Sequence, residues 1–428
     1  MKVDSPSTSH KPKLFYGWYI VMGLATVGMV STGMGGINFG LFIPPMSEDL
    51  GIKHSFFGWA QTARVVGFSL SSWLIGRILD QYGARIPMAI AGTFMGLIMV
   101  GLSSIQTGWQ IVALYLLKGM IGMEGGGGNL YQAVPLSRWF IRRRGKAISI
   151  AFLGTPIGIF IFSPLCQFLI DSTSWRSAWL LLGGTGSMVI VLIAFFVIRK
   201  DPKSMGLQPD GDLFEGEENE DVSRRQRPLP NEYSWTRSEA IRSFSFWALV
   251  AVLGLRMLSV STLNLFRIPY YIEQGVSPQL VAWALSAEAV IAAMISIPTG
   301  WAMDRFQPRF VTVTSLILYI IAFIVTMNVV TAWHVFIATT MFGAASASFM
   351  VAQNALWPAY FGGENIGSIR GLATPLTMVF SAIGAPITGA IKDSTGTYVP
   401  AWLASLFLLA TASVLMLITR KPEPPARQ

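Results

Sequence analysis

Long apolar stretches separated by short polar ones organise the whole chain. Each stretch holds about 20 residues or slightly more, the length that an α-helix needs to cross the hydrocarbon core of a bilayer. The pattern predicts an all-α membrane protein with twelve transmembrane helices. We place them at 17–42, 56–79, 87–106, 109–134, 146–170, 177–198, 244–268, 279–302, 310–330, 333–357, 368–391 and 398–419.

The longest polar interval divides these spans into two groups of six. We expect an N-terminal six-helix half at 1–198, a cytoplasmic linker at 199–243 and a C-terminal six-helix half at 244–428. The linker carries an acidic cluster that includes Asp210, followed by three arginines, a composition typical of a flexible, solvated segment. The string SEAIRSFSFW, which starts at Ser238, predicts a short interfacial helix that leads into the seventh span.

One ten-residue motif occurs twice, each time directly after an apolar run. GRILDQYGAR begins at Gly76, and GWAMDRFQPR begins 224 residues later at Gly300. Two copies at this spacing indicate that the halves are pseudo-symmetric repeats. Glycine is expected to let two helices approach closely here, whereas Gln307 replaces the second glycine of the motif and predicts a looser loop. The candidate gating residues are Gly76, Asp80, Gly83, Arg85, Gly300, Asp304 and Arg309.

Composition and charge agree with a membrane protein. Hydrophobic residues make up 52% and charged residues 12% of the chain, and the mean hydropathy is +0.53. The net charge of +9 does not indicate nucleic-acid binding, because most of the 31 Lys and Arg residues fall on one side of the predicted topology. The positive-inside rule then places both termini in the cytoplasm of a cell (inner) membrane protein. Lys53, Arg176, Arg267 and Lys392 are assigned to the outer segments.

The sequence offers no pattern of an enzyme or of a cofactor site. Cys166 is the single cysteine and lies within a span, and the three histidines lie in the N-terminal tail or near outer helix ends. This excludes a disulfide framework and the usual His-based catalytic arrangements. The Walker motif of ATP-driven pumps is also missing. We therefore expect neither catalysis nor a metal or other cofactor.

Charged residues inside the predicted spans are functional candidates, because a charge near the bilayer centre is costly unless it is paired or hydrated. Five such residues are predicted: Arg64, Lys118, Glu124, Arg256 and Glu288. Arg256 is the leading anion site because it is the most central cation, although an ion pair with Glu288 or Glu124 would explain it equally well. Arg64 and Glu288 occupy equivalent positions in the two repeats, which predicts either a gate or proton site or a permanent ion pair.

The remaining polar residues of the spans are candidates for a substrate cavity. Lys118 is a weaker candidate for contact with the substrate, and the alternative is a purely structural role. Glu124 is a second proton-coupling candidate, and it precedes the run Gly125 to Gly128, which predicts close packing or a local break beside a cavity. The uncharged candidates are Asn129, Tyr131, Gln132, Asn264, Gln353, Asn354 and Trp357.

Several local strings resemble a known family. They are FYGWYIV at 15–21, WFIRRRGKAISIAFLGTPIG at 139–158, DPKSMGLQPDG at 201–211 and YFGGENIGSIRG at 360–371. Together with the repeated loop motif, the chain resembles the major facilitator superfamily, and within it the bacterial monocarboxylate transporter and oxalate/formate antiporter group. The resemblance covers nearly the whole chain. It implies helices one, four, seven and ten around the substrate, which would be a small organic anion moved with a proton or in exchange.

Two departures from the sequence pattern of that family narrow the range of possible substrates. Many relatives that carry carboxylates have an arginine in helix eight where this chain has Ser296, and the lysine that the oxalate branch favours in helix eleven is missing. A two-carbon dicarboxylate is therefore disfavoured. The leading interpretation is a monomeric, proton-coupled secondary transporter of a monocarboxylate-like anion. The alternatives are a proton-driven exporter of drugs or amphipathic metabolites, whose helix-five glycine-proline signature is poorly matched here, and a receptor built on a transporter fold.

Overall fold

Every regular element in the described part of the chain is helical. The computed structural model describes residues 15–123, 130–141, 143–202, 205–211, 235–362 and 365–422, without the side chains of residues 37 and 144. The N-terminal helices are α1 (Gly17–Gly33), η1 (Gly36–Asn38), α2 (Phe39–Leu50), α3 (His54–Tyr82), α4 (Arg85–Ser103), α5 (Gly108–Ile121), α6 (Leu130–Trp139), α7 (Arg144–Phe152), α8 (Gly154–Ser172) and α9 (Trp175–Phe196).

The second series of helices is longer and less interrupted. After the short elements η3 (Pro209–Gly211) and α11 (Arg237–Arg242) come α12 (Phe244–Glu273), α13 (Pro278–Arg305), α14 (Pro308–Met327), α15 (Ala332–Phe361), α16 (Ile366–Thr395) and α17 (Val399–Ile418). Among the described residues, nine helices are long and apolar enough to cross a membrane. The predicted all-α membrane fold is confirmed.

Three of the twelve predicted spans consist of two helices each. The first span is α1 and α2, the fourth is α5 and α6, and the fifth is α7 and α8. The break in the first span passes through Gly36, which has a φ of 61°, a left-handed conformation that side chains other than glycine rarely adopt. The apolar pattern alone runs through this break, whereas the glycines at 33, 35, 36 and 40, with Asn38 among them, predict close packing or a local break at this place.

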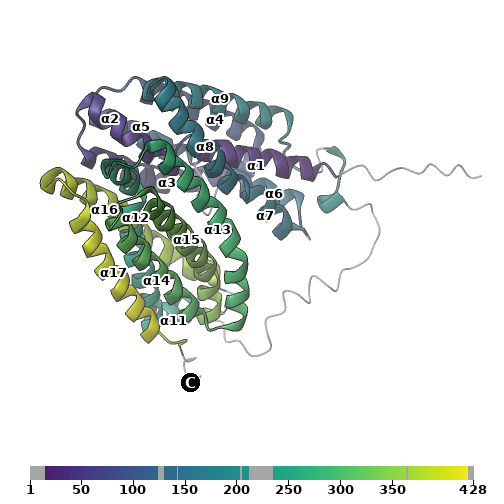
Figure 1. Ribbon diagram of the computed structural model, residues 1–428. Helices are drawn as coiled ribbons and strands as arrows, with labels where there is room; N and C mark the ends of the chain where they lie inside the picture. Colours follow the sequence, from purple (N-terminus) through teal and green to yellow (C-terminus); the bar gives the residue numbers. More distant parts are fainter. Residues whose placement is uncertain are drawn as a thin grey trace, which may run out of the picture.

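The helices form two groups that meet along a seam and diverge from it. Figure 1 shows α1–α9 extending to the right and α12–α17 extending downward from a shared apex. The helix pairs that pack across the seam include α3 against α16, α8 against α13 and α2 against α12. A Cβ atom on Gly58 would lie 2.5 Å from the carbonyl oxygen of Ala385, and one on Gly389 would lie 2.6 Å from the Cα of Ser55. Glycine is thus what permits the close approach of α3 and α16.

Polar contacts reinforce the seam at the end where α3 begins. The carboxylate of Asp393 in α16 accepts hydrogen bonds from the backbone N–H groups of His54, at 2.9 Å, and Ser55, at 3.0 Å. A carboxylate at a helix N-terminus is also favoured by the helix dipole. Burial lowers the pKa of His54, although nearby carboxylates oppose this shift, so its ring is neutral near neutral pH. We call this end of the molecule the closed end.

The predicted linker is only partly described, and its first part is not free in solution. Residues 212–234 lie outside the described residues. Asp210 is buried, and its carboxylate accepts hydrogen bonds from the backbone N–H groups of Ile141, at 2.9 Å, and Arg143, at 3.2 Å. The expectation that Asp210 belongs to a solvated acidic cluster was therefore wrong. The short helix before the seventh span is confirmed as α11, while the division into halves at 198 and 244 stays a prediction.

The glycine contacts predict how the closed end responds to added volume. We expect Gly58→Leu to force α3 away from α16, because backbone atoms of Ala385 and Pro386 occupy the space that the new side chain needs. Spin labels on Lys53 and Ser394, both exposed at this end, should report a longer distance in double electron–electron resonance. Gly184→Leu is the matched control, because nothing lies within 4 Å of its Cβ position. An unchanged distance in Gly58→Leu would contradict the role of this contact.

Candidate functional site

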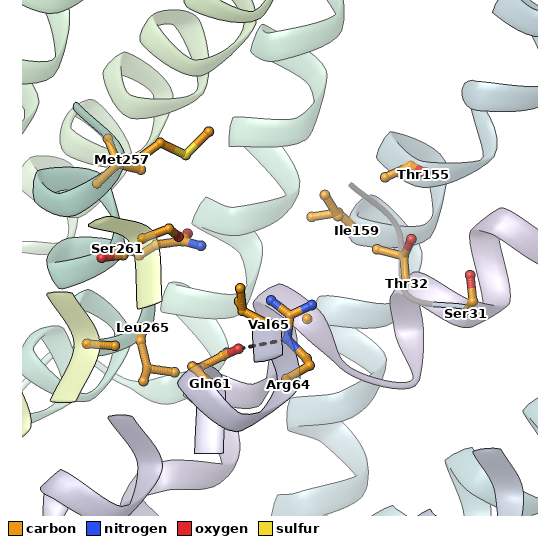
Figure 2. Close-up of a pocket in the computed structure, with 15 residues that line it drawn as sticks. Ser31, Thr32, Gln61, Arg64, Val65, Thr155, Ile159, Met257, Ser261 and Leu265 are labelled. Carbon is orange, nitrogen blue, oxygen red and sulfur yellow. Dashed lines mark hydrogen bonds between the residues drawn. The ribbon is translucent and has the colours of Figure 1, made fainter. Parts of the chain in front are cut away.

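A cavity of about 280 Å³ lies between the two groups of helices, directly beside the seam. Figure 2 shows Arg64 rising from α3 between α12 on one side and α1 and α8 on the other. Ala385 both lines the cavity and contacts Gly58, so the cavity borders the tight part of the seam. The lining residues are Ser31, Thr32, Gly36, Gln61, Arg64, Val65, Thr155, Ile159, Met257, Val260, Ser261, Asn264, Leu265, Ser381 and Ala385.

Arg64 supplies the charge of the cavity. Among the described residues that line it, Arg64 is the only one with an ionisable side chain. Its Nε donates a hydrogen bond of 2.9 Å to Oε1 of Gln61, one turn earlier on α3, and this bond helps to orient the guanidinium (Figure 2). Asn264, on α12 of the other group, also lines the cavity. Two of the predicted substrate residues are thus brought to one place from opposite halves.

The break in the first span lies at the cavity and is supported by Lys118. Gly36 lines the cavity, and α1 ends just before it. Lys118 is 1% exposed, and its Nζ donates a hydrogen bond of 3.2 Å to the carbonyl oxygen of Met34. Its ammonium also lies 4.8 Å from the ring centre of Tyr115. Because the C-terminal end of a helix carries partial negative charge, the ammonium stabilises the end of α1. Lys118 does not line the cavity, so the structure favours its structural role.

Arg256 lies in the C-terminal group, outside the lining of the cavity. Its guanidinium carbon is 5.0 Å from the ring centre of Tyr319 and 4.5 Å from that of Phe349. Nη2 donates a hydrogen bond to the hydroxyl of Tyr319, which donates in turn to Ser346 at 2.9 Å. Its neighbour Met257 lines the cavity, but Arg256 itself does not. Its predicted contact with a substrate stays a prediction.

Glu288 forms its ion pair with an arginine that the sequence analysis placed elsewhere. Arg267 is 0% exposed and belongs to α12, so its assignment to an outer segment was wrong. Its Nη2 lies 2.8 Å from Oε2 and 3.0 Å from Oε1 of Glu288 in α13. The guanidinium also lies 4.1 Å from the ring centre of Phe342 in α15. The pair thus ties three helices together.

The alternatives in which Glu288 pairs with Arg64 or Arg256 do not hold in this structure, because Arg267 is its ion-pair partner. Arg267 is the last but one residue of the predicted seventh span, and the helix continues beyond it to Glu273, so Arg267 lies inside the bundle and not in a segment outside it. A signal was present in the sequence, because Arg267 follows Asn264 by one helical turn and Arg256 by three turns. The polar residues of this helix thus extend past the end of the apolar run.

The other predicted cavity residues lie away from the described lining. The hydroxyl of Tyr131 donates to the carbonyl of Ile121 at 3.1 Å. Asn354 accepts a hydrogen bond of 3.1 Å from Arg370. Gln132, Gln353 and Trp357 are also not among the lining residues. Glu124, Gly125 to Gly128 and Asn129 lie outside the described residues.

The two copies of the loop motif differ in structure. Gly83 ends α3 with a φ of 76°, and the guanidinium of Arg138 lies 3.6 Å from the carboxylate of Asp80. In the second copy Gln307 has a φ of −62°, so that loop turns without a left-handed residue. Neither Gly76 nor Gly300 has an atom within 4 Å of its Cβ position, contrary to the close helix contact expected there.

The remaining gating candidates lie beside these loops. Arg85 begins α4 and lies 5.8 Å from the ring centre of Phe195, and Arg309 lies 4.7 Å from that of Phe310. Asp304 lies in the last turn of α13. The gating role of the seven motif residues stays a prediction.

Comparison with known proteins agrees with this geometry. The sequence matches the Major Facilitator Superfamily over residues 25–276 and 249–428. It is 23% identical to monocarboxylate transporter 12 of Xenopus laevis, over 94% of this chain and 88% of that protein. It is 25% identical to monocarboxylate transporter 4 of Rattus norvegicus, over 96% of this chain and 83% of that protein.

Solved structures show the same fold at low sequence identity. The nucleoside transporter NupG has a TM-score of 0.72 at 13% identity, covering 94% of this chain and 99% of that one. A bacterial homologue of the human lysosomal transporter Spinster, in an inward-facing and occupied conformation, has a TM-score of 0.69 at 14% identity, covering 96% of this chain and 97% of that one.

The buried ion pair predicts a specific pattern of stability. Arg267→Met should lower the free energy of unfolding by about 3–5 kcal/mol, because it leaves the buried carboxylate of Glu288 without its partner. The double variant Arg267→Met/Glu288→Met should recover most of this loss. Denaturant unfolding in mixed micelles measures both values. If the double variant loses the sum of the two single losses, the pair is not an energetic unit.

Proposed function

The chain belongs to the major facilitator superfamily of secondary transporters, and we propose that it carries a small organic anion with one carboxylate, coupled to protons. The observation that carries this proposal is the position of Arg64. Its guanidinium lies in a cavity between the two halves, where a ligand can contact both at once. A guanidinium can hold a carboxylate through two parallel hydrogen bonds. The similarity to monocarboxylate transporters supports the same substrate class.

The cavity and the seam together support transport by alternating access. In transporters built from repeats, the substrate site lies at the repeat interface, and the halves rock around it. Here the halves pack closely at the closed end and diverge toward the loop motifs (Figure 1). With both termini in the cytoplasm, this conformation would open the cavity to the cell interior. We propose that the protein acts as a monomer in the cell membrane.

Glu288 is the proposed proton-coupling group. In this conformation its carboxylate is held by Arg267. Arg267 lies one turn from Asn264 on α12, so a change in the ion pair can be transmitted along one helix to the cavity. Protonation of Glu288 removes the charge that holds Arg267 and weakens the link between α12 and α13. Uptake of a proton would thereby favour rearrangement of the C-terminal half.

The lining of the cavity disfavours the alternative of a drug exporter. Sites for large amphipathic ligands are rich in aromatic side chains. None of the described residues that line this cavity is aromatic, and about half are uncharged and polar. A small polar anion suits these walls better.

The anion site can be tested by substitution of the cavity arginine. Arg64→Gln should raise the Kd for a bound monocarboxylate by about tenfold to a hundredfold, because hydrogen bonds to a charged group contribute about 1.5–3 kcal/mol. Arg256→Gln is the matched control and should leave the Kd within about twofold, since Arg256 does not line the cavity. Calorimetric titration of the purified protein measures both. The opposite ranking of the two variants would move the anion site to Arg256.

Proton coupling can be tested separately from binding. Glu288→Gln mimics the protonated acid, so it should abolish the increase of net uptake at acidic outer pH while exchange between preloaded vesicles continues. Asp171→Asn serves as control, because Asp171 accepts a hydrogen bond from Gln167 and does not line the cavity. Retention of the wild-type pH profile by Glu288→Gln would reduce Glu288 to a structural partner.

A further inference from the structure

The charge and size of the cavity limit its ligand to a small monoanion. Arg64 gives it one positive charge, and the described lining residues supply no carboxylate. One guanidinium matches one carboxylate, whereas the second carboxylate of a diacid would be buried without a partner. A ligand ammonium would meet hydrogen-bond acceptors but no carboxylate among the described lining residues to balance its charge, which disfavours amino acids. The volume of about 280 Å³ lies just below the usual range for ligand sites, about 300–1,000 Å³, so the ligand is small.

Two hydroxyl groups of the cavity wall, those of Thr32 and Ser261, present acceptors rather than donors. Thr32 donates its hydroxyl proton to the carbonyl of Gly28 at 2.8 Å, and Ser261 donates to the carbonyl of Leu258 at 2.8 Å. A hydroxyl has a single proton, so these oxygens offer only lone pairs to a ligand. Lone pairs accept from a ligand O–H and repel a carboxylate oxygen. At Thr32 and Ser261 the walls therefore match hydroxyl groups of the ligand.

These acceptors lie on two walls, on either side of the arginine. Thr32 is on α1 and Ser261 is on α12, and Figure 2 shows Arg64 between them. Asn264, one turn from Ser261, finds no hydrogen-bond partner within the described part of the chain, so its amide can both accept and donate. Contact with both walls requires more than one hydroxyl on the ligand.

We infer that the substrate is a monocarboxylate with two or more hydroxyl groups, of the sugar-acid type. Its carboxylate binds Arg64, and its hydroxyls donate to Thr32 on α1 and to Ser261 and Asn264 on α12. This inference rests on the proposed anion transport and adds the hydroxyl requirement to it. A ligand that contacts both walls also links the two halves. This is expected of a substrate that binds before the two halves rearrange.

The inference is tested by calorimetric titration of the full chain in nanodiscs with three probes of equal carbon number. These are butanoate, trihydroxybutanoate and the neutral butanetetrol. Trihydroxybutanoate should bind at least about tenfold more tightly than butanoate, because each added hydrogen bond contributes about 0.5–1.5 kcal/mol. Butanetetrol should bind more weakly than trihydroxybutanoate, because it cannot use Arg64.

Two variants and a control test whether the preference for trihydroxybutanoate over butanoate arises from the α12 wall of the cavity. Ser261→Ala and Asn264→Leu should each reduce the ratio of the affinity for trihydroxybutanoate to the affinity for butanoate. Ser296→Ala should keep the wild-type ratio, because Ser296 makes the same kind of bond to its own helix, at 2.7 Å to Ala293, but does not line the cavity. A reduced ratio in Ser296→Ala as well would overturn the assignment to the cavity wall.

The possible outcomes separate this inference from the proposed function. If butanoate and trihydroxybutanoate bind equally and both need Arg64, the hydroxyl requirement is wrong and anion transport stands. If trihydroxybutanoate and butanetetrol bind equally and Arg64→Gln changes neither affinity, the cavity takes neutral polyols and the proposed anion transport fails. If no acid binds, both proposals are overturned.

Discussion

The high cost of an unpaired charge among apolar helices determines how this molecule is organised. Each charged side chain inside the described bundle solves this problem differently. Arg267 and Glu288 neutralise each other, Lys118 binds the carboxyl end of a broken helix, and Arg256 packs between two aromatic rings. Arg64 alone among them lies on the cavity between the halves. The position of Arg64 on the cavity lining, rather than its pairing, makes it the charge placed to meet a ligand.

The seam that closes one end has the properties of a contact that must open. It depends on close backbone approach at Gly58 and Gly389 and on a small number of polar bonds, including the carboxylate of Asp393 on the first turn of α3. Such contacts depend on a close fit of the backbones but bury few charged groups. The free energy that is lost when the seam opens is therefore modest. The cavity lies beside this seam at Ala385, and closure at one end therefore shapes one side of the substrate site.

Much of the fold follows from the sequence because apolar runs of membrane length have few alternative structures. The repeated motif and the spacing of the spans predict two similar groups of helices, and the polar residues Arg64 and Asn264, which the sequence marks as site candidates, both line the cavity. Arg267 was assigned to the outer segments because it is the last but one residue of the predicted span, where a charge resembles a surface residue, whereas the helix continues to Glu273. The sequence also favours Arg256 as the anion site, whereas in the structure Arg256 does not line the cavity, so its contact with a substrate stays a prediction. Depth in the membrane is visible in a sequence, whereas the direction in which a side chain points is set by packing.

The central claim is that one carboxylate binds at Arg64, between the halves. The most direct measurement is an experimental structure of the protein with a bromine-substituted monocarboxylate, in which anomalous scattering locates the bromine. The account predicts a single strong peak inside the cavity lined by Arg64, Ser261 and Asn264, with the carboxylate within hydrogen-bonding distance of the guanidinium. A peak beside Arg256 or Arg267, with the cavity empty, would contradict it.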